Sequence, residues 1–222
     1  MDNTIISTLA NNGLFKNMTS KEISDIIERL ETSFLEFSKD DIILWEQMPV
    51  VSIGIILNGE ALAYRTTKTG SNIIMSKLSK GSVFGDILAG APNKKSPVSI
   101  KAVIKTSVLF ISYESFVGGD AASCEGYYHM MHNYIETVSL RYFALQDRIS
   151  CLIMPTLKDK IMSYLRDCQN DKKGEPFVIP FDRESMANYL NADRSAVSRE
   201  LARLKREGVI DYYKNIFRLL HQ

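Results

Sequence analysis

Two helical segments near the C-terminus are separated by only two residues, and this spacing constrains the chain more than any other feature. Asp182 and Asp193 are each suited to cap a helix, and the first helix can run only to about Leu190. Asn191 and Ala192 must therefore turn the chain sharply. Asparagine is the best residue after glycine for the left-handed backbone that such a turn needs. The pattern predicts a helix-turn-helix.

The second of these helices separates an apolar face from a polar one. Its apolar side chains are Val197, Leu201 and Leu204, which would pack against the first helix. Serine hydroxyls and arginine guanidinium groups are then exposed at the start of the helix: Arg194, Ser195, Ser198 and Arg199. This is the end of a recognition helix that enters the major groove of DNA. Residues 193–206 hold five basic and two acidic residues, a charge that a solvated helix face would explain equally well. Two short strands around Lys214 predict a basic hairpin, or wing.

Residues 121–153 have the pattern of one long helix with apolar positions spaced as in a coiled coil. Two seven-residue series, offset by three, are apolar at every position: Tyr128, Ile135, Tyr142 and Ile149 in one, and Met131, Val138, Leu145 and Leu152 in the other. This seam predicts a parallel homodimer, and the alternative is a helix that packs only on its own domain. Pro155 ends the helix, because the residue before a proline is pushed out of the helical conformation.

Short apolar runs separated by turn residues fill the region from about 15 to 115. The runs lie at 42–45, 52–57, 61–64, 73–78, 98–104 and 108–112. This spacing is typical of a small antiparallel barrel or jelly roll, and one helix, capped by Ser20 and running to Leu30, precedes it. We expect an α+β protein with a β-barrel at 1–120, a dimerisation helix at 121–154 and a winged helix-turn-helix at 155–222.

Composition argues against several other classes of protein. The 222 residues are 45% hydrophobic and carry a net charge of +1. No apolar run reaches the roughly 18 residues of a membrane span, and no basic segment precedes the short apolar run at the N-terminus. The sequence therefore indicates a cytoplasmic protein with no membrane partner. Three widely spaced cysteines, Cys124, Cys151 and Cys168, predict neither a disulfide framework nor a zinc site.

The order of these parts resembles the Crp/Fnr family of transcription regulators over nearly the whole chain. Residues 183–201, followed by Gly208-Val209-Ile210, are similar to that family's helix-turn-helix motif, and residues 56–60 and 81–86 are similar to recurrent turns of the cyclic-nucleotide-binding fold. The resemblance implies a homodimeric regulator, not an enzyme, with an effector-sensing barrel. It would bind double-stranded DNA at a palindromic operator, and RNA polymerase if it is an activator. The implied DNA-binding residues are Arg183, Ser185, Arg194, Ser195, Ser198, Arg199 and Lys214.

Two departures from the family pattern bear on mechanism. The family commonly has glutamate where this chain has Ser195, so the family's usual half-site is not expected. Cyclic-nucleotide binders have glutamate after the glycine and an arginine with serine or threonine about ten residues on; this chain has Gly85-Asp86 and Lys94-Lys95-Ser96-Pro97. Without that arginine, cyclic AMP is not expected to bind. A pocket at Gly85, Asp86, Lys95 and Ser96 would take an unidentified small molecule, or none, and Lys94 or Lys95 would replace the arginine.

No cofactor is expected. Iron–sulfur members of the family need about four cysteines, most of them near the N-terminus, and the first cysteine here is Cys124. Cys124 with His129 and His132 raises the alternative of a metal or haem site, but solvated or hydrogen-bonded histidines explain them better. Cys151 is better explained as a buried structural thiol than as a redox sensor. A cupin-like enzyme needs clustered histidines, and residues 1–128 contain none.

Overall fold

The computed structural model describes residues 3–67, 69–91, 95–169 and 174–220. The chain divides into two compact units, Met1–Val138 and Ser139–Gln222, and the long helix α5 (Tyr127–Leu152) contributes residues to both. No helix within the described ranges is long and apolar enough to cross a membrane.

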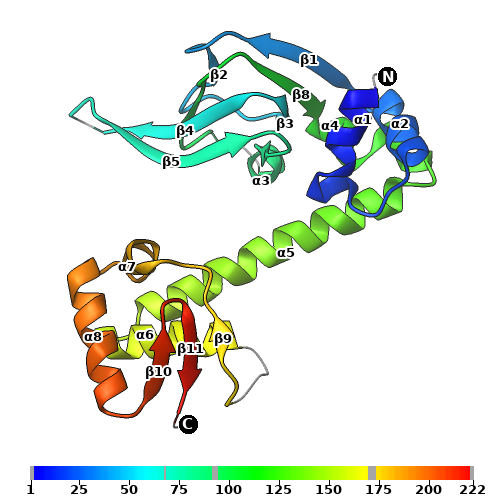
Figure 1. The fold of residues 1–222 in the computed structure, drawn as a ribbon. Helices are drawn as coiled ribbons and strands as arrows, with labels where there is room; N and C mark the ends of the chain where they lie inside the picture. The colour runs from blue at the N-terminus through cyan, green and yellow to red at the C-terminus, as the bar shows by residue number, and fades with distance from the viewer. Residues whose placement is uncertain (1–2, 68, 92–94, 170–173, 221–222) are drawn as a thin grey trace. The chain divides into compact units, whose positions relative to one another are not determined.

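Two four-stranded antiparallel sheets form the centre of the first unit (Figure 1). The first sheet has the order β1-β8-β3-β6, with β1 at Thr32–Phe37, β8 at Thr106–Ser112, β3 at Ser52–Asn58 and β6 at Val83–Phe84. The second has the order β2-β7-β4-β5, with β2 at Ile42–Leu44, β7 at Ser99–Ala102, β4 at Glu60–Thr66 and β5 at Asn72–Ser79. The α+β fold with an antiparallel barrel, predicted from the turn spacing, is confirmed.

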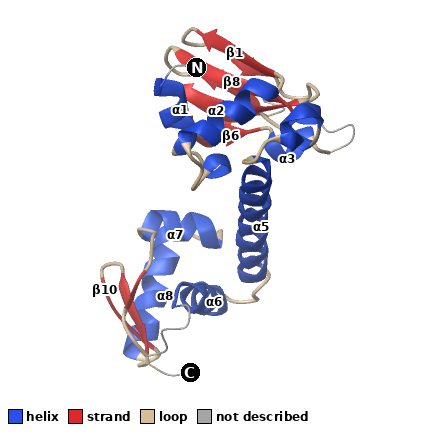
Figure 2. Cartoon of the chain, turned by 90° about the vertical axis from the view of Figure 1, so that its right-hand side faces the viewer, coloured by secondary structure: helices blue, strands red, loops and turns tan. Residues whose placement is uncertain are grey.

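Helices cover one face of the first sheet (Figure 2). They are α1 (Asn3–Ala10), α2 (Ser20–Arg29), α4 (Tyr113–Val117), the 3-10 helices η1 (Gly13–Phe15) and η2 (Gly119–Ser123), and the first turns of α5; the short α3 (Asp86–Ala89) follows β6. Their buried side chains form one core with alternate residues of β3 and β8, among them Ile53, Ile55, Leu109 and Ile111.

Strand β3 is buried on both faces and therefore joins two cores. Ile53 and Ile55 face the helices, whereas Ile56 lies in the second core, between the two sheets. Gly54 shares the face of Ile56 and pairs with Phe84 of β6. The ring of Phe84 occupies the space that a Cβ atom on residue 54 would need, and it packs edge-on against Phe110 with the ring centroids 5.9 Å apart.

Three local features of this unit differ from the sequence prediction. The cap of α2 is Thr19 rather than Ser20, because Glu22 completes a capping box: the Thr19 hydroxyl accepts from the Glu22 amide, and the Glu22 carboxylate accepts from the Thr19 amide at 2.7 Å. Strand β1 was not predicted, since its edge position leaves most of its side chains exposed and gives no alternating pattern. Helix α5 begins at Tyr127 rather than near 121, because residues 119–123 form the separate turn η2.

The second unit packs three helices against a small sheet. These are α6 (Leu157–Gln169), α7 (Arg183–Leu190) and α8 (Arg194–Arg206), with β9 (Phe177–Val178), β10 (Ile210–Tyr213) and β11 (Ile216–Leu219) in the order β10-β11-β9. Their shared core includes Ile161, Leu165 and Phe217 and also the Cys151 side chain from the last turn of α5. The Cys151 thiol donates to the Lys160 carbonyl at 3.3 Å, and burial raises its pKa.

We predict that Gly54→Ala lowers the free energy of unfolding of the first unit by about 1–3 kcal/mol, because the new methyl group must displace the buried Phe84 ring. Gly118→Ala is the matched control: its backbone is extended, and the nearest atom to the new Cβ is the Glu114 carbonyl oxygen at an ordinary 3.8 Å. Thermal and urea unfolding of both variants would measure the difference. Equal stability of the two variants would contradict this account of β3.

Candidate functional site

Helices α7 and α8 are joined by a turn whose geometry depends on Asn191. This residue adopts φ 50° and ψ 57°, the left-handed conformation predicted from the sequence, and the Ala192 amide then donates to the Ala187 carbonyl at 3.0 Å. The start of α7 is fixed by Asp182, whose carboxylate accepts from the Ser185 amide at 2.8 Å. Hydrogen bonding to Ser185 lowers the pKa of Asp182, so the carboxylate stays ionised as a cap.

Helix α8 buries its apolar face completely. Val197, Leu201 and Leu204 are 0% exposed and pack against Met186 and Leu190 of α7. The opposite face of the first turn and a half is exposed and carries the predicted reading residues: Arg194, Ser195, Ser198 and Arg199. Asp193 occupies the cap position, but its side chain accepts no capping hydrogen bond, contrary to the sequence prediction.

The basic residues of α8 differ in how they are paired. The Arg203 guanidinium binds Glu207 at 2.8 Å and Glu200 at 3.5 Å. Lys205 binds the Asp211 carboxylate at 2.6 Å and donates to the Tyr212 carbonyl at 3.0 Å. By contrast, the Arg194 side chain is 68% exposed and lies 4.0 Å from Glu184, at the limit of an ion pair. Exposed arginines without a close carboxylate therefore lie at both ends of α8, with Arg194 and Arg199 at its start and Arg206 in its last turn.

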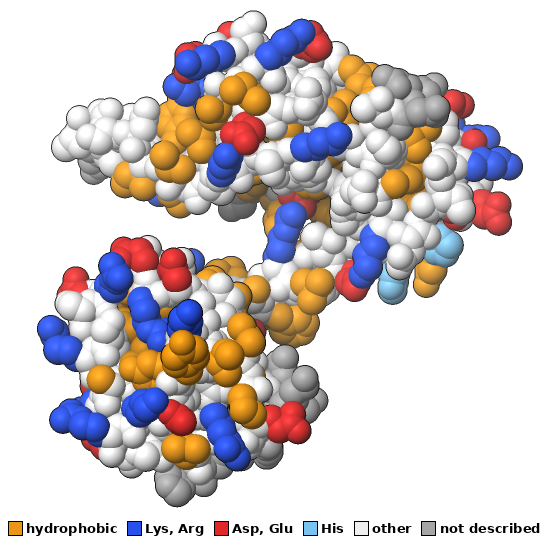
Figure 3. Space-filling view, viewed as in Figure 1, with side chains coloured by type: hydrophobic (Ala, Val, Ile, Leu, Met, Phe, Trp, Pro, Cys, Tyr) orange, Lys and Arg blue, Asp and Glu red, His pale blue; other side chains and the backbone are white. Residues whose placement is uncertain are grey.

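A wing made of β10 and β11 follows α8. Its turn contains Lys214, which has a positive φ of 52°, and the hairpin pairs Tyr212 with Phe217 across the two strands. Asp182, Arg183, Glu184 and Arg194 line a cavity of about 790 Å³ together with the wing residues Tyr213, Lys214, Asn215 and Ile216. The start of α7, the start of α8 and the wing turn thus border one hollow. On the face drawn in Figure 3, the second unit mixes Lys and Arg side chains with apolar ones.

Two of the predicted DNA-binding residues occupy different settings. Ser185 is exposed in the first turn of α7. Arg183 lies against the wing: its Nη2 donates to the Lys214 carbonyl at 2.9 Å, and its guanidinium lies over the Tyr212 and Phe217 rings. Burial lowers the pKa of Arg183. Neither this contact nor the Lys205–Asp211 pair was predicted from the sequence. The pairing of the two rings could have been predicted, because Tyr212 and Phe217 lie at equal distances from a two-residue turn and so face each other across the hairpin.

The predicted effector residues lie around α3 and in the segment that leads into β7. Gly85 has φ 77°, and a Cβ there would lie 2.8 Å from the Ser52 carbonyl oxygen, so the position requires glycine. Asp86 is buried, and its backbone carbonyl accepts from the Tyr134 hydroxyl at 3.2 Å. Lys95 is exposed, and Ser96 is buried with its hydroxyl donating to the Val98 carbonyl at 2.6 Å. Lys94 lies outside the described residues.

The predicted seam of α5 carries large apolar side chains that are exposed in the single chain. Exposure is 75% for Tyr128, 60% for Ile135, 55% for Tyr142, 58% for Leu145 and 45% for Ile149. The other three seam residues, Met131, Val138 and Leu152, are partly buried. A helix that packed only on its own domain would bury such a stripe.

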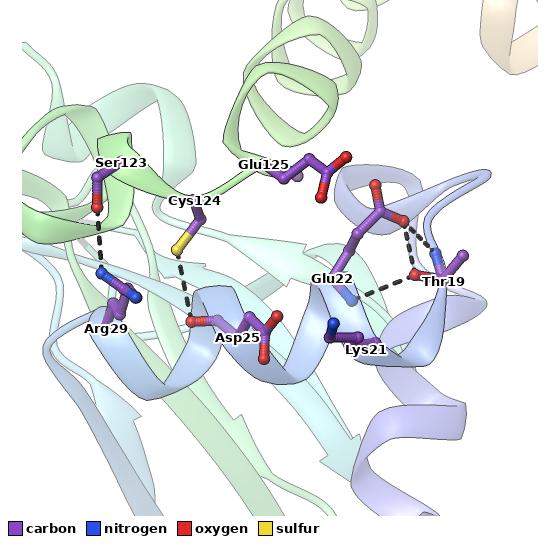
Figure 4. A pocket seen from close by; sticks show the side chains of 9 residues that line it. Thr19, Lys21, Glu22, Asp25, Arg29, Ser123, Cys124 and Glu125 are labelled. Atoms are coloured by element: carbon purple, nitrogen blue, oxygen red, sulfur yellow. Dashed lines mark hydrogen bonds between the residues drawn. The ribbon is translucent and has the colours of Figure 1, made fainter.

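A polar pocket of about 430 Å³ lies between α2 and the segment that leads into α5 (Figure 4). In it, Arg29 donates to the Ser123 hydroxyl at 3.1 Å, and the Cys124 thiol lies 3.6 Å from the Asp25 carbonyl. Beside the pocket, His129 Nδ1 lies 3.2 Å from Glu22, so this histidine is hydrogen-bonded. Among the described residues, no three His, Cys, Asp or Glu side chains are grouped to hold a metal ion.

Two family models match the chain. The cyclic nucleotide-binding domain matches residues 34–118, and the Crp-like helix-turn-helix domain matches residues 159–221. A search of curated protein sequences found no match.

Solved structures show the same fold. The catabolite activator protein of Thermus thermophilus is 18% identical, with a TM-score of 0.50 over 94% of this chain and 93% of its own. The sensor domain of the transcriptional regulator DNR from Pseudomonas aeruginosa is 14% identical, with a TM-score of 0.52 over 68% of this chain and 93% of its own.

The two domains occur in the order that the sequence predicts, a cyclic nucleotide-binding domain followed by a Crp-like helix-turn-helix domain. The protein is thus a DNA-binding transcription regulator and not an enzyme, and it belongs to the Crp/Fnr family.

Proposed function

We propose that this regulator binds a palindromic DNA operator as a homodimer and reads base edges with the first turns of α8. The observation that carries the proposal is the exposed group Arg194, Ser195, Ser198 and Arg199, set on a helix whose other face is fully buried. Guanidinium groups can donate two hydrogen bonds to guanine, and hydroxyl groups can contact several base edges. Each subunit of a two-fold dimer presents one such helix, so two inverted half-sites about 10 base pairs apart are expected.

Because of Ser195, we expect the DNA half-site of this protein to differ in sequence from the half-site common in the family. Members of the resembled family commonly carry a glutamate here, which accepts a hydrogen bond from cytosine. The exposed Ser195 hydroxyl is shorter and uncharged, so it cannot provide that contact in the same position. The operator therefore has to be selected from random DNA rather than inferred from relatives.

We predict that Arg194→Ala and Arg199→Ala each weaken binding to the selected palindrome by roughly 1–3 kcal/mol and that at least one of them relaxes the choice of base. Fluorescence anisotropy with single-base variants of the operator measures both effects. Lys205→Ala is the matched control: its ammonium group is already bound to Asp211 and the Tyr212 carbonyl. It should change affinity little and leave base preference intact. If both arginine variants bind with unchanged affinity and preference, α8 is not the reading helix.

The dimer is proposed to form through the seam of α5. Five seam residues expose large apolar surfaces in the single chain, and pairing with a second α5 would remove that surface from water. The seam positions recur every seven residues, as the register of a parallel coiled coil requires.

We predict that replacing Val138 and Leu145 together by glutamate converts the dimer to a monomer, because four carboxylates would enter the seam of the pair and each would lose its water. Leu140→Glu is the control, since Leu140 is 63% exposed on α5 but lies outside the two seam series. Sedimentation velocity measures the result. A double variant that still sediments as a dimer would refute the seam.

The sensing domain is proposed not to use cyclic AMP, although its fold is that of a cyclic nucleotide-binding domain. Cyclic-nucleotide binders of the resembled family hold the cyclic phosphate with an arginine, and the corresponding stretch here has lysines and Pro97 instead. The adjacent Ser96 hydroxyl is buried and already donates to the Val98 carbonyl. We propose that the domain either binds a different, unidentified small molecule or has no effector.

We predict that isothermal titration of the full chain with cyclic AMP gives no heat of binding at micromolar concentrations, because the stretch that carries the family's phosphate-binding arginine has lysines instead. The variant Asp86→Asn shows whether any binding that is seen uses the predicted pocket. Micromolar binding that this variant abolishes would contradict the proposal.

The remaining partners follow from the DNA-binding role. A regulator acts in the compartment that holds its operator, and we propose the cytoplasm of a bacterial cell. RNA polymerase is a partner if the protein activates transcription, and a repressor needs no such contact. Transcription in vitro from a promoter that carries the selected operator distinguishes the two.

A further inference from the structure

Arg183 has the charge and position of a DNA contact, but both of its terminal nitrogens are withdrawn from solvent or already engaged. Nη2 donates to the Lys214 carbonyl at 2.9 Å. Nη1 is buried and has no hydrogen-bond partner among the described residues. A phosphate oxygen could reach Nη1 only if the wing moved, and one hydrogen of Nη2 is already committed to the Lys214 carbonyl.

Two aromatic rings lie against this guanidinium group. Its carbon lies 5.2 Å from the centroid of the Tyr212 ring and 5.1 Å from that of Phe217. The two rings stack across the β10–β11 hairpin with centroids 5.2 Å apart and an interplanar angle of 22°. Cation–π contacts of this kind are stabilising at partly buried sites. Arg183, the first residue of α7, therefore contacts both strands of the wing.

The same side chain fixes the turn that carries the exposed lysine of the wing. The acceptor of Arg183 is the backbone carbonyl of Lys214, a residue held at a positive φ of 52°. Such a conformation is disfavoured for a residue with a side chain, so it requires support from its neighbours. The Lys214 ammonium group itself points over the Tyr213 ring at 5.6 Å, on the border of the cavity beside Arg194.

We propose that Arg183 is a positioning residue for DNA binding: it holds the wing turn against the start of α7, so that Lys214, and not Arg183, contacts the phosphate backbone. This inference rests on the proposed function for its DNA readout. Its effect on the wing, however, is a property of the free protein and can be measured without DNA.

The first experiment is a double-mutant cycle with Arg183→Met, Lys214→Ala and the combination, titrated against the selected operator at several salt concentrations. Methionine keeps the apolar length of the arginine side chain and removes its charge and its donors. If Arg183 acts through Lys214, each single variant loses a similar factor in affinity, about tenfold, and the double variant loses no more than the worse single one. The slope of log affinity against log salt falls by about 0.9 in all three, since only one phosphate contact is lost.

A direct contact by Arg183 gives a different result. The losses in affinity would then multiply, and the salt slope of the double variant would fall by about 1.8, twice the value for one phosphate. That result would overturn the proposal, as would an Arg183→Met variant with the affinity of the wild type.

The second experiment measures amide hydrogen exchange of the DNA-free protein. Arg183→Met should speed exchange in residues 210–219 while leaving α8 protected, because the wing loses its connection to α7 and the helix core is untouched. Arg206→Met is the control, since it removes an exposed arginine from the last turn of α8. Unchanged exchange in the wing of Arg183→Met would refute the positioning role. A wild-type protein that binds no DNA would instead refute the proposed function and leave this readout valid.

Discussion

The surface that we propose faces DNA depends on the crossing of α7 and α8. The crossing is fixed by the left-handed Asn191 at the turn and by the buried contact of Ala187 with the apolar face of α8. A larger side chain at 187 would separate the two helices, and another backbone conformation at 191 would redirect α8. In both cases the first turn of α8, with Arg194, would point elsewhere. The proposed reading residues Arg194, Ser195, Ser198 and Arg199 lie outside this buried contact, so they can differ without changing the crossing.

Contacts within the second unit distinguish some of its cations from others. Arg183, Arg203 and Lys205 are held by carbonyls, carboxylates or ring faces of the same unit. Arg194 and Arg199 are exposed at the start of α8. Residues of the same type, within one segment, therefore have different roles that only their partners reveal. Under the proposed function, stability of the wing and recognition of DNA belong to separate side chains.

Much of the fold could be predicted from the sequence, because it is encoded in local patterns. The cap at Asp182, the turn at Asn191 and the buried stripe of α8 each follow from a few neighbouring residues, and the structure confirms them. The missed elements, such as β1 at the sheet edge, carry no alternating pattern. The pairing of Lys205 with Asp211 could not be predicted, since a charge pattern does not say which carboxylate folds back onto which cation. The seam and the DNA contacts remain predictions.

The ion pair between Lys205 and Asp211 has a consequence for how such a regulator finds its target. Attachment to random DNA comes almost entirely from cations that displace counterions along the phosphates, and each cation neutralised within the protein removes one such contribution. The affinity for arbitrary sequence falls, whereas contacts made only at the operator are unaffected. The protein then spends less time on the wrong stretches of a chromosome, and its occupancy of the right one rises without any stronger contact to that site.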